Sequence, residues 1–424
     1  MSVRLAGTGR NRVVSRTGRA AADTSGHFAA GVAVLAAGTL VVLSSVLLSP
    51  GIDAVTKHFE SQSVSWASPD LVAKMMVTSP AVVVAIVAPF GGWLLDRLGR
   101  RQVLLASLAI FGLAGGVGGL LSNPATLLAS RVVFGLGVAG LLLASTTLIG
   151  DYFDGSRRRQ MLGWQIAAIS VVSTAGMFLA AYLVQISWRI PFAIYLLALP
   201  LLPWAWAQID EPSEEEKSDD ADADEQDGIP WFQVGLVYVA AFLALAIFHL
   251  ATTQIPSYLG ELGYGSPYMT ALIISIISVA GIPSSILFDK ARDRFSNQSL
   301  LVGVFGVGAI GFGIAGVYES IGTLVAGLTV FGLLYGFRTP AFNAWLLNCA
   351  PAEFRGRLVG GLTSACFAGI FASPLLSEPL KQAVGMPGVI LVSAGLQLAF
   401  AAAFAYFVVV KGRGQCDDGQ CETS

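Results

Sequence analysis

Hydrophobic residues form long runs along this chain, and short polar segments separate them. Each run holds about 20 residues, which is the length that an α-helix needs to cross a bilayer. Strands are excluded at these lengths, because a lipid-exposed sheet would leave backbone groups without hydrogen bonds. The pattern predicts twelve transmembrane helices, at residues 28–48, 73–95, 103–121, 126–149, 161–184, 189–208, 231–254, 268–288, 299–317, 322–347, 358–380 and 388–410.

The composition also indicates an integral membrane protein. Of 424 residues, 54% are hydrophobic and 12% are charged, about half the charged fraction of a soluble domain. We find no P-loop, paired catalytic carboxylates or common zinc pattern, so we expect no enzyme, cofactor, metal or nucleic-acid partner. Two G-x-G-x-x-G matches, starting at Gly135 and Gly306, lie inside apolar runs and predict helix-packing faces rather than dinucleotide loops.

Positive charge predicts the orientation of the helices. Most Lys and Arg residues lie in the N-terminal leader and in alternate loops, while the loops at 122–125 and 318–321 carry none. Because Lys and Arg concentrate in cytoplasmic loops, we expect both termini in the cytoplasm and the chain in the inner cell membrane.

An acidic segment divides the chain into two halves. Eleven acidic residues lie between Asp210 and Asp227, and we expect a solvated linker there, with a partner-binding segment as the alternative. A shift of 197 positions carries Asp96 onto Asp293 and Arg158 onto Arg355. This repeat predicts two related six-helix bundles. The predicted divisions are a basic leader (1–26), a first bundle (27–208), the linker (209–229), a second bundle (230–410) and a tail (411–424).

Charges of both signs occur in the loops that we place in the cytoplasm. Anchoring by positive charge explains the arginines but does not require the aspartates. We therefore expect ion pairs between adjacent loops that close the cytoplasmic end of a transport path. The candidates for this cytoplasmic gate are Asp96, Arg97, Arg100, Asp151, Arg158, Asp293, Arg294 and Arg355.

Polar residues inside the apolar runs are the candidates for the transport path, since a charge at the bilayer centre costs at least about 2.5–3.5 kcal/mol. Arg338 is a candidate anion contact, with a structural pair as the alternative, and snorkelling explains Arg131 equally well. His249 and Glu378 compete as proton carriers. The candidates are Arg131, His249, Gln254, Arg338, Asn343 and Glu378; Asp70 and Lys74, four residues apart, predict only a local pair.

The segment 91–101, GGWLLDRLGRR, closely resembles the signature loop of the major facilitator superfamily. The segments 131–137, 150–153 and 351–357 are also similar to that family. The resemblance implies an all-α membrane fold of twelve helices in two pseudo-symmetric bundles. Its nearest branch in style is the drug:proton antiporters and sugar exporters. Asp96 and Arg100 would then form a gate with Asp151, and Arg131 would be linked to proton coupling.

These observations predict a secondary transporter that works by alternating access as a monomer. The leading hypothesis is proton-coupled efflux of a small organic compound, such as a drug-like molecule, a sugar or a metabolite. A symporter or facilitator for an anionic metabolite is the alternative, favoured by Arg338 and the scarcity of buried acids. A non-transporting membrane receptor is a third hypothesis, and the matched gate charges in both halves argue against it.

Overall fold

The computed structural model describes residues 28–60, 67–211, 230–349 and 354–417, which form helices joined by short turns and irregular segments. The predicted leader (1–26) and most of the acidic linker lie outside these residues. The first half contains a helix at 28–39, η1 (Leu40–Val42), α2 (Leu43–Val46), η2 (Ser49–Gly51), α3 (Ile52–Glu60), α4 (Pro69–Val87), η3 (Ala88–Phe90), α5 (Gly91–Leu98), α6 (Arg100–Val117), η4 (Gly118–Leu120), α7 (Pro124–Tyr152), α8 (Gly155–Ile186), η5 (Ile190–Leu197) and α9 (Ala198–Gln208).

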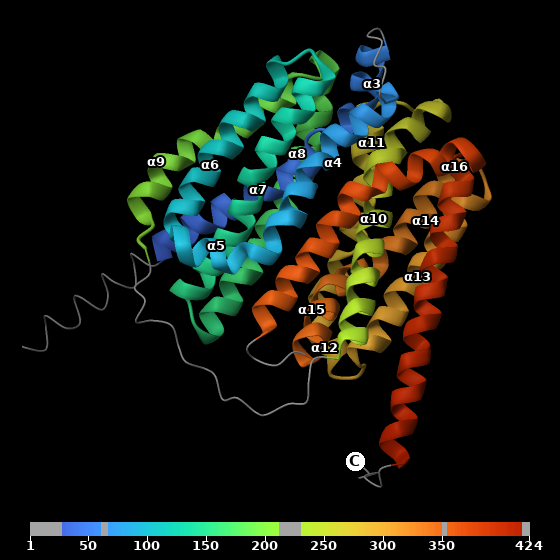
Figure 1. The fold of residues 1–424 in the computed structure, drawn as a ribbon. Coiled ribbons are helices and arrows are strands. Elements are labelled where there is room, and N and C mark those ends of the chain that lie inside the picture. The colour runs from blue at the N-terminus through green and yellow to red at the C-terminus, as the bar shows by residue number, and fades with distance from the viewer. Residues whose placement is uncertain (1–27, 61–66, 212–229, 350–353, 418–424) are drawn as a thin grey trace, which may run out of the picture.

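The second half begins after the linker and runs to the end of the described chain. It contains α10 (Trp231–Glu261), α11 (Pro267–Ala280), α12 (Ile282–Arg292), α13 (Asn297–Val317), α14 (Ile321–Leu333), η7 (Tyr335–Phe337), α15 (Arg338–Cys349) and α16 (Arg355–Asp417). Figure 1 places α3 and the bend of α16 at one end of the molecule, and α12 and the C-terminal end of α16 at the other. We call these ends the upper and lower faces.

Within the described residues, eleven helices are long and apolar enough to cross a membrane. The last one, α16, has 63 residues and is interrupted at Gly385, where φ is 69° and ψ is 174°. A straight helix of that length would measure about 95 Å, roughly three times the apolar thickness of a bilayer. The chain instead turns at Gly385 and descends again (Figure 1). The two arms of α16 contain the last two predicted runs, which gives twelve crossings.

The starts of several helices follow from short capping sequences. The side chains of Ser68, Asn123 and Ser266 accept hydrogen bonds from backbone N–H groups in the first turns of α4, α7 and α11. A proline follows each cap at the first helical position, where its missing N–H is not needed and its fixed φ suits the helix. The start of each of these helices is therefore encoded locally in the sequence.

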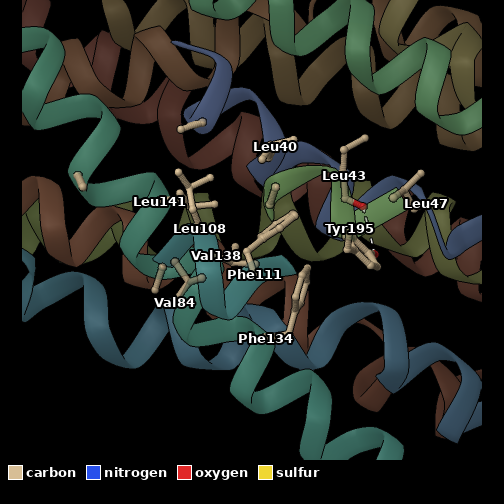
Figure 2. Packing of buried hydrophobic residues seen from close by; sticks show 14 of the residues in the cluster. Leu40, Leu43, Leu47, Val84, Leu108, Phe111, Phe134, Val138, Leu141 and Tyr195 are labelled. Carbon is tan, nitrogen blue, oxygen red and sulfur yellow. Dashed lines mark hydrogen bonds between the residues drawn. The ribbon is translucent and has the colours of Figure 1, made fainter. Parts of the chain in front are cut away.

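Each half has its own apolar core. One cluster of buried side chains lies between residues 33 and 209, and two others lie between 234 and 404. In the first core the rings of Phe111 and Phe134 lie 4.7 Å apart, and the Tyr195 hydroxyl donates to the Leu43 carbonyl at 3.4 Å (Figure 2). Smaller clusters join the halves, with Met177 of α8 packing near Ile274 of α11.

Glycines allow the closest contacts between helices. The sequence predicted helix-packing faces at the two G-x-G-x-x-G motifs, and most glycines of these motifs do pack closely. A Cβ added at Gly137 would lie 2.6 Å from the Phe111 backbone nitrogen, and one at Gly311 would lie 2.6 Å from the Gly327 carbonyl oxygen. Gly306 is an exception, because it faces open space. Small residues at helix crossings permit this approach in membranes, where packing drives helix association.

We predict that Gly311→Ala will destabilise the second half, because the new methyl group would meet backbone atoms that cannot move aside. Overpacking of this kind costs about 1–3 kcal/mol, and the melting temperature of the purified protein in detergent should fall. Gly313→Ala is the matched control in the same helix, since nothing lies within 4 Å of its added Cβ. Equal melting temperatures for the two variants would contradict the close packing of α13 against α14.

Candidate functional site

The two halves meet along α4, α10 and α16, where charged and polar side chains are buried. Lys74 of α4 is the centre of this contact, and its side chain is 0% exposed. Its ammonium donates to the carboxylate of Asp70, to Gln254 Oε1 at 2.6 Å and to Glu378 Oε2 at 2.9 Å. An ammonium has three N–H donors, so each of them finds an acceptor.

Neighbouring side chains hold these acceptors in place. Gln254 Nε2 donates to Ser377 Oγ at 2.7 Å, which orients the amide so that its oxygen faces Lys74. Ser257 donates to Asp70 Oδ1 at 3.2 Å. We call Asp70, Lys74, Gln254 and Glu378 the upper cluster. It joins α4 of the first half to α10 and α16 of the second.

The upper cluster corrects the sequence-based interpretation of Lys74. The predicted Asp70–Lys74 pair is present, but Lys74 also binds two residues that lie 180 and 304 positions further along the chain. The sequence analysis named Gln254 and Glu378 as candidates for the transport path but did not connect either of them with Lys74. The one signal in the sequence was a charged residue in each of two apolar runs, Lys74 and Glu378, and only the fold decides that residues so far apart form a pair.

Arg338 begins α15 at a break in the helix that crosses the second half. The segment Tyr335–Phe337 is a 3₁₀ turn, and Gly336 in it lies so close to α12 that an added Cβ would be 2.3 Å from Ser285 Oγ. The guanidinium carbon of Arg338 lies 4.4 Å from the centre of the Tyr335 ring. Tyr335 in turn stacks on Phe248 of α10, with 4.5 Å between the ring centres.

The Arg338 guanidinium is only partly satisfied. Its Nη2 donates to Thr339 Oγ1 at 3.2 Å, while its buried Nε and Nη1 have no hydrogen-bond partner in the part of the chain that the structure describes. Asn343, the nearby candidate, uses its Nδ2 to donate to the Thr339 carbonyl at 3.0 Å. His249 lies near enough for the charge of Arg338 to act on it. The site therefore presents a cation with two nitrogens that are unpaired within the described chain, with the Tyr335 ring beside it and Phe248 stacked on that ring.

Arg131 occupies a different environment, inside the first half. It is fully buried, and its guanidinium carbon lies 3.9, 5.0 and 5.5 Å from the ring centres of Phe134, Tyr195 and Phe192. The snorkelling alternative is thus wrong, because the side chain does not reach the surface. All three rings belong to α7 and η5, so Arg131 faces the first core rather than the contact between the halves.

The gate residues of the first half gather at the lower face. Arg100 Nη1 lies 2.8 Å from Asp151 Oδ2, and Arg100 Nη2 lies 3.5 Å from Asp96 Oδ1. The Asp96 side chain is 60% exposed, whereas those of Arg100 and Asp151 are largely buried. Arg158 lies near enough to act on Asp151 electrostatically, while Arg97 packs over Trp93, 5.5 Å from its ring centre.

The carboxylate of Glu211, which the sequence did not indicate as a site residue, also binds this loop. Glu211 accepts hydrogen bonds from the backbone N–H groups of Arg100 at 2.6 Å and Arg101 at 3.0 Å. These are the first residues of α6, and a negative charge at a helix N-terminus is favourable. Gly99 precedes them with φ of 83°, a conformation that glycine adopts readily.

The other predicted gate residues belong to the second half. Asp293 and Arg294 line a hollow of about 680 Å³ together with Lys290 and Phe337, and Arg355 begins α16. Near the lower face, α16 instead touches the first half through Ser364, whose hydroxyl donates to the Ala85 carbonyl.

Comparisons with known proteins agree with this architecture. The sequence profile described as Major Facilitator Superfamily matches residues 32–374. The cis,cis-muconate transport protein of Acinetobacter baylyi is 24% identical over 348 residues, covering 78% of this chain and 81% of that protein. The gallate transporter of Pseudomonas putida is 24% identical over 408 residues, covering 86% and 90%.

Two further similarities concern export and fold. The cephamycin export protein CmcT of Amycolatopsis lactamdurans is 28% identical over 308 residues, covering 71% of this chain and 57% of that protein. The crystal structure of a D-xylose–proton symporter superposes with a TM-score of 0.72 at 18% identity, covering 89% and 97%. The helices, the two cores and the profile match lead to one conclusion: this chain belongs to the major facilitator superfamily and is a multi-pass membrane transporter, not an enzyme.

Proposed function

We propose that this protein moves a small organic anion across the cell membrane by proton-coupled secondary transport. The observation that carries the proposal is the buried guanidinium of Arg338, two of whose nitrogens have no partner among the described residues. A buried cation without a matching anion is costly. A carboxylate substrate would supply the missing charge and could accept two parallel hydrogen bonds from the guanidinium.

The backbone at Arg338 favours the same substrate class. The helix is broken just before Arg338, so α15 begins inside the protein. Half-helix N-termini carry partial positive charge and point at anionic groups of substrates in several transporter folds. The Tyr335 ring lies next to the cation and stacks on Phe248, so the guanidinium has aromatic neighbours. Together these groups suit a small molecule with a carboxylate and a planar apolar part.

Two of the relatives support an anionic substrate. Their names specify muconate and gallate, both of which are carboxylates. The third relative is named for cephamycin export and favours a second candidate function, the proton-driven efflux expected from the sequence. One proton crossing 100 mV releases about 2.3 kcal/mol, which sustains a substrate gradient of roughly fiftyfold without ATP.

Counterflow in proteoliposomes would separate these possibilities. Vesicles preloaded with a candidate acid should accumulate the labelled acid, and neutral analogues should fail to compete. An imposed pH gradient should then change the net flux, and its sign gives the direction of coupling. Counterflow of neutral drug-like compounds in preference to acids would contradict the anion proposal and favour the efflux of neutral compounds.

We predict that Arg338→Gln will raise the KM for an organic acid by roughly ten- to a hundredfold, because a hydrogen bond to a charged group contributes about 1.5–3 kcal/mol. Initial uptake rates at several concentrations would measure it. Arg189→Gln is the control, since Arg189 donates to Ser122 Oγ at 3.1 Å in the first half, far along the chain from α15. Unchanged KM in Arg338→Gln would remove this residue from the substrate site.

We also propose that the lower face is cytoplasmic and that Arg100, Asp96 and Asp151 belong to a gate there. The lower loops contain the arginines of segment 97–101, as positive-inside orientation requires. Arg100 is shared between two carboxylates, so small shifts of α6 against α7 change which ion pair forms. Such an element can take two arrangements during alternating access.

Asp151→Asn should lower transport about tenfold or more while the protein still inserts into the membrane, because it leaves the largely buried Arg100 with its weaker partner. Flux per inserted molecule is the measurement. Asp154→Asn is the control: this residue is exposed, and its side chain makes no capping hydrogen bond to α8. Normal flux in Asp151→Asn would count against the gate.

A further inference from the structure

A hollow of about 680 Å³ lies near the lower end of the second half, where α12, α13 and the 3₁₀ turn η7 meet. Two cations, Lys290 and Arg294, line it together with the carboxylate of Asp293. Most of the other lining side chains are apolar, and they include Leu287, Phe295, Leu300 and Leu334. We call this feature the lower hollow. Its volume lies within the range of about 300–1,000 Å³ that is typical of small-molecule sites.

We propose that the lower hollow binds an anionic phospholipid, with Lys290 and Arg294 at the lipid phosphate and the apolar lining along an acyl chain. Neither cation forms an ion pair among the residues that the structure describes. Together with Asp293 they leave one uncompensated positive charge. Asp289 and Arg292 of the same segment do not line the hollow, and their charges cancel. Basic pockets between transmembrane helices bind lipid headgroups of this kind.

The internal repeat shows that this positive charge belongs to the second half only. In the first half, loop 96–101 and the two carboxylates that bind it are electrically balanced, with three cations and three anions: Arg97, Arg100, Arg101, Asp96, Asp151 and Glu211. The shift of 197 positions keeps one pair, as Asp293 and Arg294, and replaces the other four residues by neutral ones. It also carries Trp93 onto Lys290, so this lysine supplies the unbalanced charge.

The position of the lower hollow favours a lipid over a small water-soluble anion. The side chains of Leu287 and Phe295 are 46% and 57% exposed, and exposed apolar groups of this size mark contact with a membrane. The hollow reaches from Arg294, in the turn after α12, to Leu334, which follows α14 inside the second half. A cation at the loop with an apolar wall beyond it matches a phospholipid, whose charged headgroup is joined to an apolar chain.

A lipid in the lower hollow would hold three segments together. The hollow is bounded by α12, α13 and η7, so a ligand that fits it binds the folded arrangement and raises the free energy of unfolding. Phe337 lines the hollow and directly precedes Arg338. The bound lipid would therefore touch the turn at which the helix is broken.

The test is a titration of the purified full chain in detergent with fluorescent phosphatidylglycerol, whose headgroup is anionic. We expect saturable binding that unlabelled phosphatidylglycerol displaces at least about tenfold more effectively than phosphatidylcholine with the same acyl chains. Inorganic phosphate should displace it poorly, because it has no acyl chain for the apolar wall. The assay needs no transported substrate, so its failure differs from a failure of the anion proposal.

Two variants test the two parts of the lower hollow. Lys290→Gln combined with Arg294→Gln should raise the dissociation constant of the lipid by roughly twentyfold or more, because each cation beside an anionic lipid contributes about fivefold. Gly303→Phe keeps both cations and fills the hollow with a ring, since Gly303 is part of its lining. This variant should also weaken binding by about tenfold or more, and it covers the case in which the double variant fails to fold.

Arg157→Gln combined with Arg292→Gln is the matched control. It removes the same charge from the lower face, at exposed positions that do not line the hollow. The dissociation constant should change by less than about threefold, because solvent and salt screen charges outside the site. An equal loss of binding in this control would indicate attraction to any basic surface and would overturn the proposal. Wild-type affinity in Gly303→Phe, or equal displacement by phosphatidylcholine or by inorganic phosphate, would overturn it as well.

Discussion

The free-energy cost of a charge inside a membrane protein governs where this chain keeps its ionic groups. Three buried cations show three ways of meeting that cost. Lys74 has an acceptor for every N–H group. Arg131 has aromatic rings around it and no hydrogen-bond acceptor among the described residues. Arg338 has one hydrogen bond and one ring, and two of its nitrogens remain without a partner.

These differences suggest that the three cations have different roles. A cation within a single core, such as Arg131, stays in the same surroundings while the halves move. A cation whose partners come from both halves, such as Lys74, holds one arrangement of the halves. Arg131 also lacks hydrogen-bond partners in the described part of the chain, but three rings of one core enclose it. Arg338 lies at a helix break with one ring beside it, so the two nitrogens that stay unpaired among these residues have capacity left for a ligand. The electrostatics therefore separate a structural role, a conformational role and a binding role.

Backbone breaks place these cations where they act. Gly385 turns the chain so that the two arms of α16 become separate crossings, and Glu378 lies shortly before that turn. The 3₁₀ turn before Arg338 depends on Gly336, which is packed against α12 too closely for any side chain. These two glycines thus help to set where Glu378 and Arg338 lie, because each allows a backbone conformation or a close approach that another residue would prevent.

The sequence alone determined the transmembrane helices, because about twenty apolar residues have no other stable arrangement in lipid. The sequence also identified the family, because the signature loop at 91–101 is one continuous segment that can be recognised without the fold. It did not reveal that Lys74 meets Glu378, that Arg131 is enclosed by rings, or that Glu211 caps α6. Those partners lie far apart in the chain, and apolar helices show no clear inner face. Only the packing of twelve crossings decided which charges meet, because a buried charge is paired by its neighbours in space.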